Sequence, residues 1–167
     1  MLGELQDAGN TVTLAHYLEL LASAGLIVGL PKFAGARVRQ RGSSPKLLVR
    51  NTALMSAFLG LSQSEARRTP QIWGRLVESA VGAHLCNSAT SAVTEVFYWR
   101  ERGKEVDYVV RSGRSLVAFE VKSGDGRAAP SGLAEFAKVF GPNRTLIVGA
   151  DGIPLADFLA EPLESWF

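Results

Sequence analysis

Apolar positions in the second half of the chain recur first at helical and then at strand spacing. Ile72–Cys86 carries apolar side chains three and four residues apart, which predicts a helix with one buried face. The segments beyond it alternate between β-rich and helical patterns. The predicted strands are Val93–Trp99, Val106–Val110, Ser115–Lys122 and Thr145–Gly149, and the later helices are Leu133–Phe140 and Ile153–Leu159. This order of elements predicts an α/β domain over residues 70–167.

The first 61 residues follow a different order. The predicted helices are Leu2–Ala8, Thr11–Ala24 and Thr52–Leu61, and the predicted strands are Leu26–Leu30 and Lys46–Arg50, with a Gly-, Arg- and Ser-rich loop between them. Helix, turn, helix, strand, basic loop and strand is the order of a winged helix-turn-helix that lacks its first helix. We therefore expect residues 1–61 to be a partial winged helix, with an upstream domain missing from this chain. The polar segment Ser62–Pro70 is the expected linker.

Composition limits the classes of protein and of site. No apolar stretch approaches the roughly 20 residues that a membrane helix needs, so we expect no membrane association. Cys86 is the only cysteine of the sequence, which excludes an internal disulfide and suits a reducing cytoplasm. With His16 and His84 as the only histidines, the chain cannot build a structural zinc site. Any metal would be a hard cation bound by oxygen ligands.

Positive charge is concentrated in the first region. No acidic residue lies between Glu19 and Glu65, and the predicted loop carries Arg37, Arg39 and Arg41. A basic run of this kind can attract a polyanion such as DNA, but a solvated loop that merely lacks acids is an equally good interpretation. The predicted helix before it carries no Lys or Arg, which favours a packing or protein-interaction role over DNA reading.

Tyr98-Trp99-Arg100 ends a predicted strand and is a second candidate for contact with nucleic acid. The aromatic rings could stack on bases while Arg100 contacts a phosphate. The alternative is a strand end that packs on the core and leaves the arginine solvated. Arg100 and the three loop arginines are the candidate nucleic-acid-binding residues.

Charged residues inside two apolar strands carry the strongest chemical signal. Asp107, Glu120 and Lys122 lie where burial of a charge is costly, so a specific role is expected. A symmetric turn centred on Ser112-Gly113 would pair Asp107 with Ala118 and make Glu120 its diagonal neighbour on the same face. Two carboxylates at that separation can bracket a divalent cation, and Lys122 follows on the same face, within reach of a water or phosphate beside it.

These residue types suit metal-assisted hydrolysis of a phosphodiester. Carboxylates can hold Mg²⁺ (or Mn²⁺), which polarises the phosphate and lowers the pKa of a bound water. A lysine on the same face can orient that water and offset the charge that develops on phosphorus. Asp107, Glu120 and Lys122 are therefore the candidate catalytic residues. The alternative is a ladder of structural ion pairs on a half-exposed sheet face.

The spacing of these residues resembles a known motif. Asp107, a gap of twelve residues and Glu120-Val-Lys122 resemble the PD-(D/E)xK motif of restriction-endonuclease-like nucleases. The resemblance implies a restriction-endonuclease-like mixed sheet flanked by helices, with a metal-binding glutamate on the preceding helix, and Glu78 matches that position. The implied metal ligands are Glu78, Asp107 and Glu120. Gly74 and Gly82, four residues on either side of Glu78, form a small stripe that would let the helix approach the sheet.

Six short segments in order extend the resemblance to nearly the whole chain. They are Tyr17-Leu-Glu-Leu-Leu21, Ser44-Pro-Lys-Leu-Leu48, Gly74-Arg-Leu-Val-Glu78, Tyr98-Trp-Arg100, Glu105-Val-Asp-Tyr-Val109 and Phe119-Glu-Val-Lys122. The set resembles the C-terminal region of prokaryotic AAA-type ATPases, in which a winged helix and a nuclease-like domain of unknown function follow the ATPase module. The sequence contains no Gly-x4-Gly-Lys-Ser/Thr loop, so the ATPase domain is expected as a missing partner. Arg50-Asn51 departs from the family, which usually carries an acidic residue there.

Three functions remain open from the sequence. The first is an Mg²⁺-dependent nuclease domain that acts on DNA. The second is a catalytically silent module of nuclease fold that serves the missing ATPase or another protein. The third is a DNA-binding winged helix whose affinity depends on the loop arginines.

Overall fold

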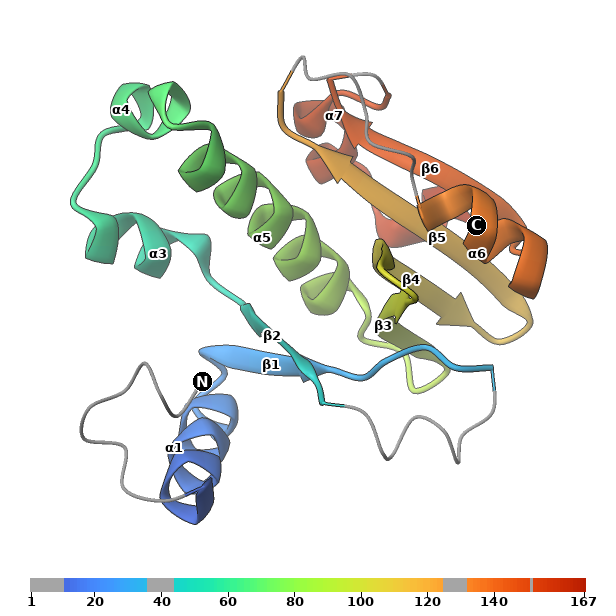
Figure 1. The fold of residues 1–167 in the computed structure, drawn as a ribbon, viewed down its shortest axis with the longest axis horizontal. Helices are drawn as coiled ribbons and strands as arrows, with labels where there is room; N and C mark the ends of the chain where they lie inside the picture. The colour runs from blue at the N-terminus through green and yellow to red at the C-terminus, as the bar shows by residue number, and fades with distance from the viewer. Residues whose placement is uncertain (1–10, 36–43, 125–131, 151) are drawn as a thin grey trace.

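The computed structural model of the protein describes residues 11–35, 44–124, 132–150 and 152–167. The predicted helix Leu2–Ala8 and the loop residues Arg37, Arg39 and Arg41 lie outside the described residues. Helix α5 (Pro70–Ser88) separates a four-stranded sheet from a smaller N-terminal part and contacts both (Figure 1). No described helix is long and apolar enough to cross a membrane.

The four-stranded sheet has the strand order β3-β4-β5-β6. Its strands are β3 (Thr94–Glu101), β4 (Lys104–Ser112), β5 (Ser115–Lys122) and β6 (Arg144–Gly149). The first three pair antiparallel and β6 runs parallel to β5, so the predicted α/β fold with a mixed sheet flanked by helices is confirmed. Arg102 and Gly103 turn the chain between β3 and β4 with φ of 49° and 77°, which is the backbone of a two-residue hairpin turn.

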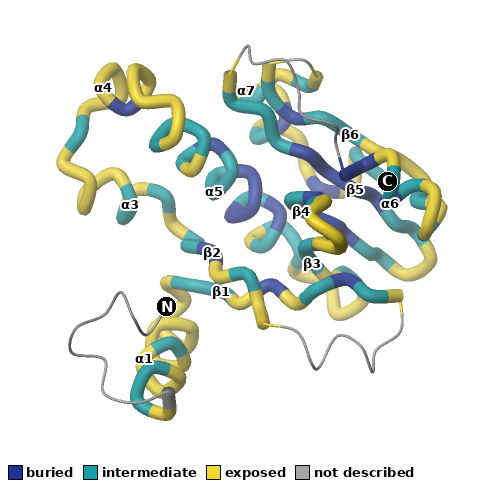
Figure 2. Tube along the Cα trace, viewed as in Figure 1, coloured by how far each residue is buried: buried dark blue, intermediate teal, exposed yellow. Residues whose placement is uncertain are grey.

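Helices cover both faces of this sheet. Besides α5 they are α6 (Gly132–Phe140), α7 (Leu155–Ala160) and the short 3₁₀ helix η2 (Leu163–Trp166). Val81 of α5 packs with Phe119 of β5 and Phe158 of α7 on one face. Ala118, the neighbour of Phe119, points to the opposite face and packs with Phe136 of α6. Figure 2 shows the buried residues concentrated along α5 and the central strands.

Two glycines control how closely α5 approaches the sheet. A Cβ at Gly82 would overlap the Tyr108 ring, so only glycine lets this buried side chain of β4 lie against the helix. The Tyr108 hydroxyl then donates a hydrogen bond of 2.8 Å to the backbone carbonyl of Glu78. At Gly74 an added Cβ would lie 3.2 Å from the Ser123 hydroxyl, beyond the end of β5. The glycine stripe thus brings the turn that carries Glu78 to β4.

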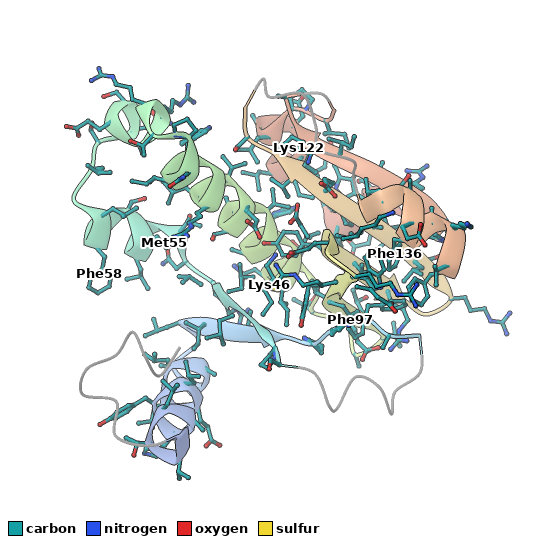
Figure 3. The ribbon with its side chains drawn as sticks, viewed as in Figure 1. Lys46, Met55, Phe58, Phe97, Lys122 and Phe136 are labelled. Atoms are coloured by element: carbon teal, nitrogen blue, oxygen red, sulfur yellow. The ribbon has the colours of Figure 1, made fainter. Side chains whose placement is uncertain are left out.

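The N-terminal part contains one described helix, a small antiparallel sheet and two further short helices. They are α1 (Thr11–Ser23), β1 (Ile27–Leu30), β2 (Lys46–Val49), α3 (Thr52–Leu59) and α4 (Gln63–Arg68). The order helix, strand, strand, helix agrees with the sequence pattern, and assignment as a winged helix stays a prediction. Figure 3 shows Phe58 of α3 pointing away from the fold, 91% exposed, whereas Phe97 and Phe136 point into the core.

Helix α4 occupies most of the segment Ser62–Pro70 that was expected to be a linker, and no helix was predicted there. Its start is a capping box, in which the Ser62 hydroxyl accepts from the Glu65 backbone amide and the Glu65 carboxylate accepts from the Ser62 amide. Such a cap contributes about 1 kcal/mol. Ala66 is buried and the rest of the helix is exposed, so no apolar periodicity marked it in the sequence.

The chain before residue 36 and after residue 43 attaches to the edge strand β3. The Phe33 amide donates to the Tyr98 carbonyl at 2.7 Å, and the Tyr98 amide donates to the Pro31 carbonyl at 3.1 Å. The Tyr98 hydroxyl donates to the Ser44 carbonyl at 2.7 Å. These three bonds hold the β1–β2 sheet beside the four-stranded sheet, and they bring the start of β2 close to β4.

Candidate metal and phosphodiesterase site

The β4–β5 hairpin brings Asp107 and Glu120 to neighbouring strands, in a register different from the one expected. The observed pairs are Val109 with Ala118 and Tyr108 with Phe119, so Asp107 is not the partner of Ala118. The regular pairing ends at Tyr108 and Phe119, one residue before Asp107 and Glu120. The turn is centred one residue later than expected, on Gly113-Arg114, because Gly113 takes a positive φ of 58°. Pairing therefore shifts by two residues along the regular part of the hairpin, from Tyr108 to Ser112.

An irregularity in β4 changes where the Asp107 carboxylate can reach. The pairing of β3 with β4 shifts between Phe97 and Trp99, so two β4 residues, Asp107 and Tyr108, lie opposite one β3 residue. The Asp107 side chain extends toward the edge of β5, where its Oδ2 accepts a hydrogen bond of 2.8 Å from the Val121 amide. Its Oδ1 lies 3.9 Å from the Lys46 ammonium on the α5 side of the sheet.

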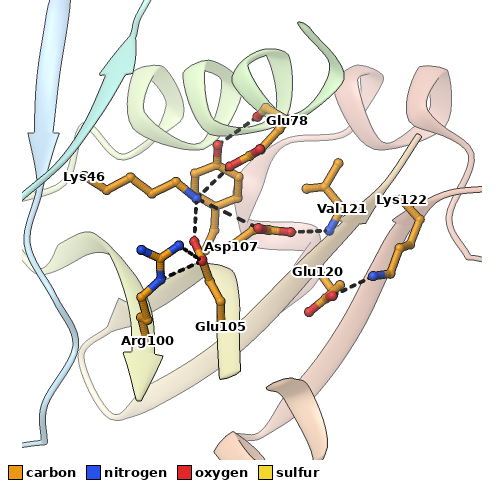
Figure 4. Close-up of polar contacts among 9 residues, drawn as sticks. Lys46, Glu78, Arg100, Glu105, Asp107, Glu120, Val121 and Lys122 are labelled. Atoms are coloured by element: carbon orange, nitrogen blue, oxygen red, sulfur yellow. Dashed lines mark hydrogen bonds and ion pairs between the residues drawn. The ribbon is translucent and has the colours of Figure 1, made fainter. Parts of the chain in front are cut away.

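Lys46, at the start of β2, is the centre of the largest group of charges in the site. Its Nζ lies 2.6 Å from Glu78 Oε1, 3.2 Å from Glu105 Oε1 and 3.9 Å from Asp107 Oδ1 (Figure 4). The same ammonium lies 5.5 Å from the centre of the Tyr108 ring. Its side chain is 23% exposed, so these attractions act in a partly water-excluded environment.

Glu120 and Lys122 form the second half of the site. They alternate with Phe119 and Val121 along β5, so they lie on the α6 side of the strand. Glu120 is a buried carboxylate, 8% exposed, and the Lys122 ammonium donates to its Oε1 at 2.7 Å. The amide of Val121, between these two residues, is the one bound by Asp107. All four predicted residues are therefore near the same end of β5, but they form two groups. The expected pair of Asp107 and Glu120 on one face is not observed, because Asp107 reaches Lys46 on the α5 side and Glu120 lies on the α6 side.

The donor set suits a hard divalent cation by its chemistry, because carboxylate oxygens are the ligands that Mg²⁺ and Mn²⁺ prefer. The geometry of this conformation does not suit one. Across residues 11–35, 44–124, 132–150 and 152–167, no three Asp, Glu, His or Cys side chains are grouped so that they could hold a metal ion. Lysine ammonium groups accompany the carboxylates instead. Metal binding by Glu78, Asp107 and Glu120 stays a prediction.

Burial and neighbouring charges shift the pKa values of Asp107 and Lys46. Burial is the largest cause of the raised pKa of Asp107, which is about 6. The negative charges of Glu78 and Glu120 also raise this pKa, whereas the hydrogen bond from Val121 and the charge of Lys46 lower it. For Lys46 burial lowers the pKa, but the bond to Glu78 and the charges of Glu78, Asp107 and Glu105 outweigh burial, so the net shift is upward. Lys46 is therefore a cation at neutral pH, and the fold resists ionisation of Asp107.

Replacing Asp107 by asparagine is expected to stabilise the protein above pH 6. The raised pKa means that ionised Asp107 costs stability once the pH exceeds its ordinary value of 3.8, and the full cost is reached above about 6. Asparagine can still accept from the Val121 amide. We expect the free energy of unfolding to rise by about 1–3 kcal/mol at pH 7.5, with no difference at pH 3.5, in urea titrations. The exposed Asp157→Asn is the control, and a loss of stability in Asp107→Asn at pH 7.5 would contradict this account.

Arg100, the described candidate for nucleic-acid contact, lies at the rim of this site. Its guanidinium donates through both Nε and Nη2 to Glu105 Oε2, while Glu105 Oε1 accepts from Lys46. The Arg100 side chain is 67% exposed, so one side of it remains accessible to solvent. Contact with nucleic acid is neither supported nor contradicted by this pair.

Sequence reasoning missed Lys46 and the bridging position of Glu105. The sequence pattern placed Lys46 only in the predicted strand Lys46–Arg50 and the segment Ser44-Pro-Lys-Leu-Leu48, and Glu105 only in the segment Glu105-Val-Asp-Tyr-Val109. The available signal was an imbalance of charge, because the three candidate metal ligands were all carboxylates and Lys122 was the one lysine among the candidate residues. No local pattern could supply the partner, because Lys46 and Glu105 are 59 residues apart in the chain.

Comparisons with known proteins match the chain to two families of unknown function. The family model of a domain of unknown function, DUF4143, matches residues 73–157, which include Glu78, Asp107, Glu120 and Lys122. A second family model, also of a domain of unknown function (DUF8612), matches residues 2–65, which include Lys46. No solved structure matches the chain.

Two curated relatives are uncharacterized proteins of Mycobacterium tuberculosis and Mycobacterium bovis. Each is 37% identical to this chain over 120 residues, which is 70% of the chain and 26% of the relative. The chain thus spans about a quarter of the length of these relatives. Because the first family model covers half of the chain, the protein belongs to the DUF4143 family, whose function is unknown.

Proposed function

We propose that this chain carries a metal-dependent nuclease domain that hydrolyses DNA phosphodiesters and forms the C-terminal part of an AAA-type ATPase. The observation that carries the proposal is the 2.8 Å hydrogen bond from the Val121 amide to Asp107 Oδ2. It joins the aspartate of β4 to the backbone between Glu120 and Lys122 of β5. Two acids and a lysine therefore lie near one end of a hairpin, and these residue types suit phosphodiester hydrolysis.

Each residue has a role that its surroundings support. Asp107 and Glu120 would hold the cation, with Glu78 approaching from α5, since Tyr108 fixes the backbone of that turn. The Lys122 ammonium, now 2.7 Å from Glu120, can donate to a phosphate oxygen or orient the attacking water. When bound, Mg²⁺ or Mn²⁺ would supply positive charge and a water of lowered pKa. Arg100 offers an exposed guanidinium at the rim for the backbone of the DNA.

The expected partners follow from the relatives and from the N-terminal part. The relatives are about four times longer than the matched segment, which leaves room in them for an ATPase module. The N-terminal part, with its helix and two-stranded sheet, would be a partial winged helix between that module and the nuclease domain. Its loop arginines, Arg37, Arg39 and Arg41, would add contacts to phosphates.

Cleavage of supercoiled and single-stranded circular DNA tests the proposal. We expect nicking by the wild-type chain with 5–10 mM Mg²⁺ or Mn²⁺ (roughly saturating for such sites) and none with EDTA. Asp107→Ala and Glu120→Gln should each lower the rate by about 100-fold or more, because each removes a group that contacts the reacting centre.

Asp157→Asn, which removes an exposed carboxylate of α7, is the matched control and should cleave like the wild type. No cleavage by the wild type with any metal or DNA form, or equal cleavage by Asp107→Ala, would reject the nuclease. That result would favour a catalytically silent module of the same fold. The pairing of Lys46 and Lys122 with the carboxylates is the observation that favours this second candidate.

A further inference from the structure

The N-terminal part exposes most of its apolar side chains. Helices α1 and α3 are largely apolar, yet no described residue of either helix is buried. Eight of the ten large apolar residues that are exposed in the described chain belong to residues 12–59, among them Tyr17, Leu20, Leu26 and Phe58. A single exposed leucine is ordinary, but a concentration of this kind is typical of a surface that another molecule covers.

A groove of about 550 Å³ opens in this surface. Its walls are the end of α1, one face of the β1–β2 sheet, α3 and the first turns of α5, and they are almost entirely apolar. Figure 3 shows Met55 and Phe58, two of the lining residues, on α3, with Phe58 pointing away from the rest of the fold. No residue of the candidate site lines the groove among those that the structure describes.

The charge of the groove is positive. Arg75 is the one charged residue among the described residues that line it. The sequence has no acidic residue between Glu19 and Glu65, so β1, β2 and α3 contribute no carboxylate. Glu19 lies two positions before Leu21, and side chains at that spacing point to different sides of a helix. The Glu65 carboxylate is bound by the amide and hydroxyl of Ser62.

The walls also select the backbone of the occupant. Three of them are helices, whose backbone groups are bonded within each helix. The β1–β2 sheet presents a face, because Ile27 and Val49 line the groove and are partners in the strand register. An extended peptide would find no unpaired strand edge to bond along these walls, whereas a helix satisfies its own backbone and enters through its side chains.

We propose that the groove binds an amphipathic helix of another protein that carries carboxylates beside its apolar face. Apolar side chains at spacing i, i+3 or i+4, and i+7 lie between α3 and α5, and a neighbouring carboxylate pairs with Arg75. Phe58 covers the apolar side of the bound helix and loses its exposure to water. This interaction is independent of the proposed nuclease, since it uses the side of α5 that faces away from the four-stranded sheet.

Two other occupants match the groove less well. A symmetric contact with a second copy uses the same surface on both copies, so it brings a second Arg75 to walls that carry no carboxylate. DNA supplies negative charge, but phosphates do not remove apolar side chains from water. An acidic amphipathic helix satisfies both the apolar walls and the arginine.

A pair of synthetic helical peptides tests the proposal on the full 167-residue chain. Both peptides have roughly 14 residues and leucines at spacing i, i+3, i+4 and i+7, and their flanking residues are glutamate in one and lysine in the other. Fluorescence anisotropy at pH 7.5 measures their affinities. We expect the glutamate peptide to bind about 10-fold or more tightly than the lysine peptide, and Arg75→Glu to reverse this preference.

Phe58→Ser should weaken binding of the glutamate peptide by about 10-fold or more, because it removes an aromatic side chain at the centre of the contact. Phe58 is 91% exposed, so the substitution leaves the core unchanged and the variant should fold. Val93→Ser, which also removes an exposed apolar side chain but lies outside the groove, is the control and should bind like the wild type. Equal affinity for the two peptides, binding of neither, or unchanged binding by Phe58→Ser would overturn the proposal.

The remaining occupants give distinct results. We expect sedimentation of a monomer, and a wild-type dimer that Phe58→Ser dissociates would assign the groove to a second copy and overturn the proposal. Residues 1–10 lie outside the described residues. Tighter peptide binding by Leu5→Ser would assign the groove to that segment of the chain itself, and displacement of the glutamate peptide by duplex DNA would assign it to nucleic acid. Either result would equally overturn binding of a partner helix.

Discussion

Lys46→Met is expected to lower the free energy of unfolding by about 2–4 kcal/mol at pH 7.5 in the presence of EDTA. Methionine keeps the length of the side chain but leaves Glu78, Glu105 and Asp107 without the cation that lies between them. Removing one partner from a buried ion pair costs about 3–5 kcal/mol, and the 23% exposure of Lys46 reduces that figure. Urea unfolding followed by fluorescence, with the buried Trp99 among the reporters, measures the loss.

Lys104→Met provides the comparison for an exposed pair. Lys104 lies 3.5 Å from Glu135, with both side chains more than 40% exposed, so its removal should cost less than about 0.5 kcal/mol. The loss in Lys46→Met should also shrink at pH 4.5, where Asp107 is protonated and fewer negative charges need a partner. Equal losses in the two variants would mean that Lys46 is held no more firmly than a surface lysine.

Gly149→Ala is expected to lower the free energy of unfolding by about 3 kcal/mol or more. Gly149 ends β6 beside Lys122, with φ of 115°, where a side chain is strained. A Cβ built there would overlap the backbone carbonyl of Lys122, the oxygen that accepts a 3.1 Å hydrogen bond from the Ala150 amide. Backbone atoms of a central strand cannot move aside cheaply, so either the β5–β6 pairing or the following turn must shift.

Gly60→Ala separates the two causes of this loss. Gly60 also has a positive φ, of 60°, but a Cβ there would have no atom within 4 Å. It should therefore cost about 1 kcal/mol, which is the conformational penalty alone. Equal losses of stability in the two alanine variants would mean that the overlap of a Cβ at Gly149 with the Lys122 carbonyl adds no cost, which would contradict this explanation. Urea midpoints of the two variants, with equal slopes, decide between these outcomes.

Most elements of the fold were predictable because apolar periodicity directly reflects burial. Helix α5 and strand β5 carry their buried residues at helical and strand spacing, so the sequence pattern found both. Helix α4 was missed because a capping box, and not an apolar face, supports it. The predicted hairpin register was wrong by two residues because Gly113-Arg114, and not Ser112-Gly113, forms the turn. The sequence was compatible with Gly113 as either the first or the second residue of the turn.

The candidate site was only partly predictable, because its charges meet through tertiary contacts. The spacing of Asp107, Glu120 and Lys122 along two adjacent strands placed them near the end of one hairpin, where the Val121 amide donates to Asp107. The expected common face of Asp107 and Glu120 was not found, because Glu120 pairs with Lys122 on the α6 side. The irregularity in β4 directs Asp107 partly toward Lys46, and strand alternation alone could not predict it. Lys46 itself comes from a separate sheet, so neither spacing nor parity pointed to it.

The ion pairs of Lys46 also bear on how the protein can be divided. The two family models meet between residues 65 and 73, which suggests a convenient point for truncation. A fragment that starts at residue 73 would keep Glu78, Glu105 and Asp107 and would lose the cation that neutralises them. Such a fragment would carry a more acidic surface patch and would repel DNA in that region more strongly than the full chain does. Its metal affinity and its electrostatics would therefore differ from those of the parent protein, even if its fold were intact.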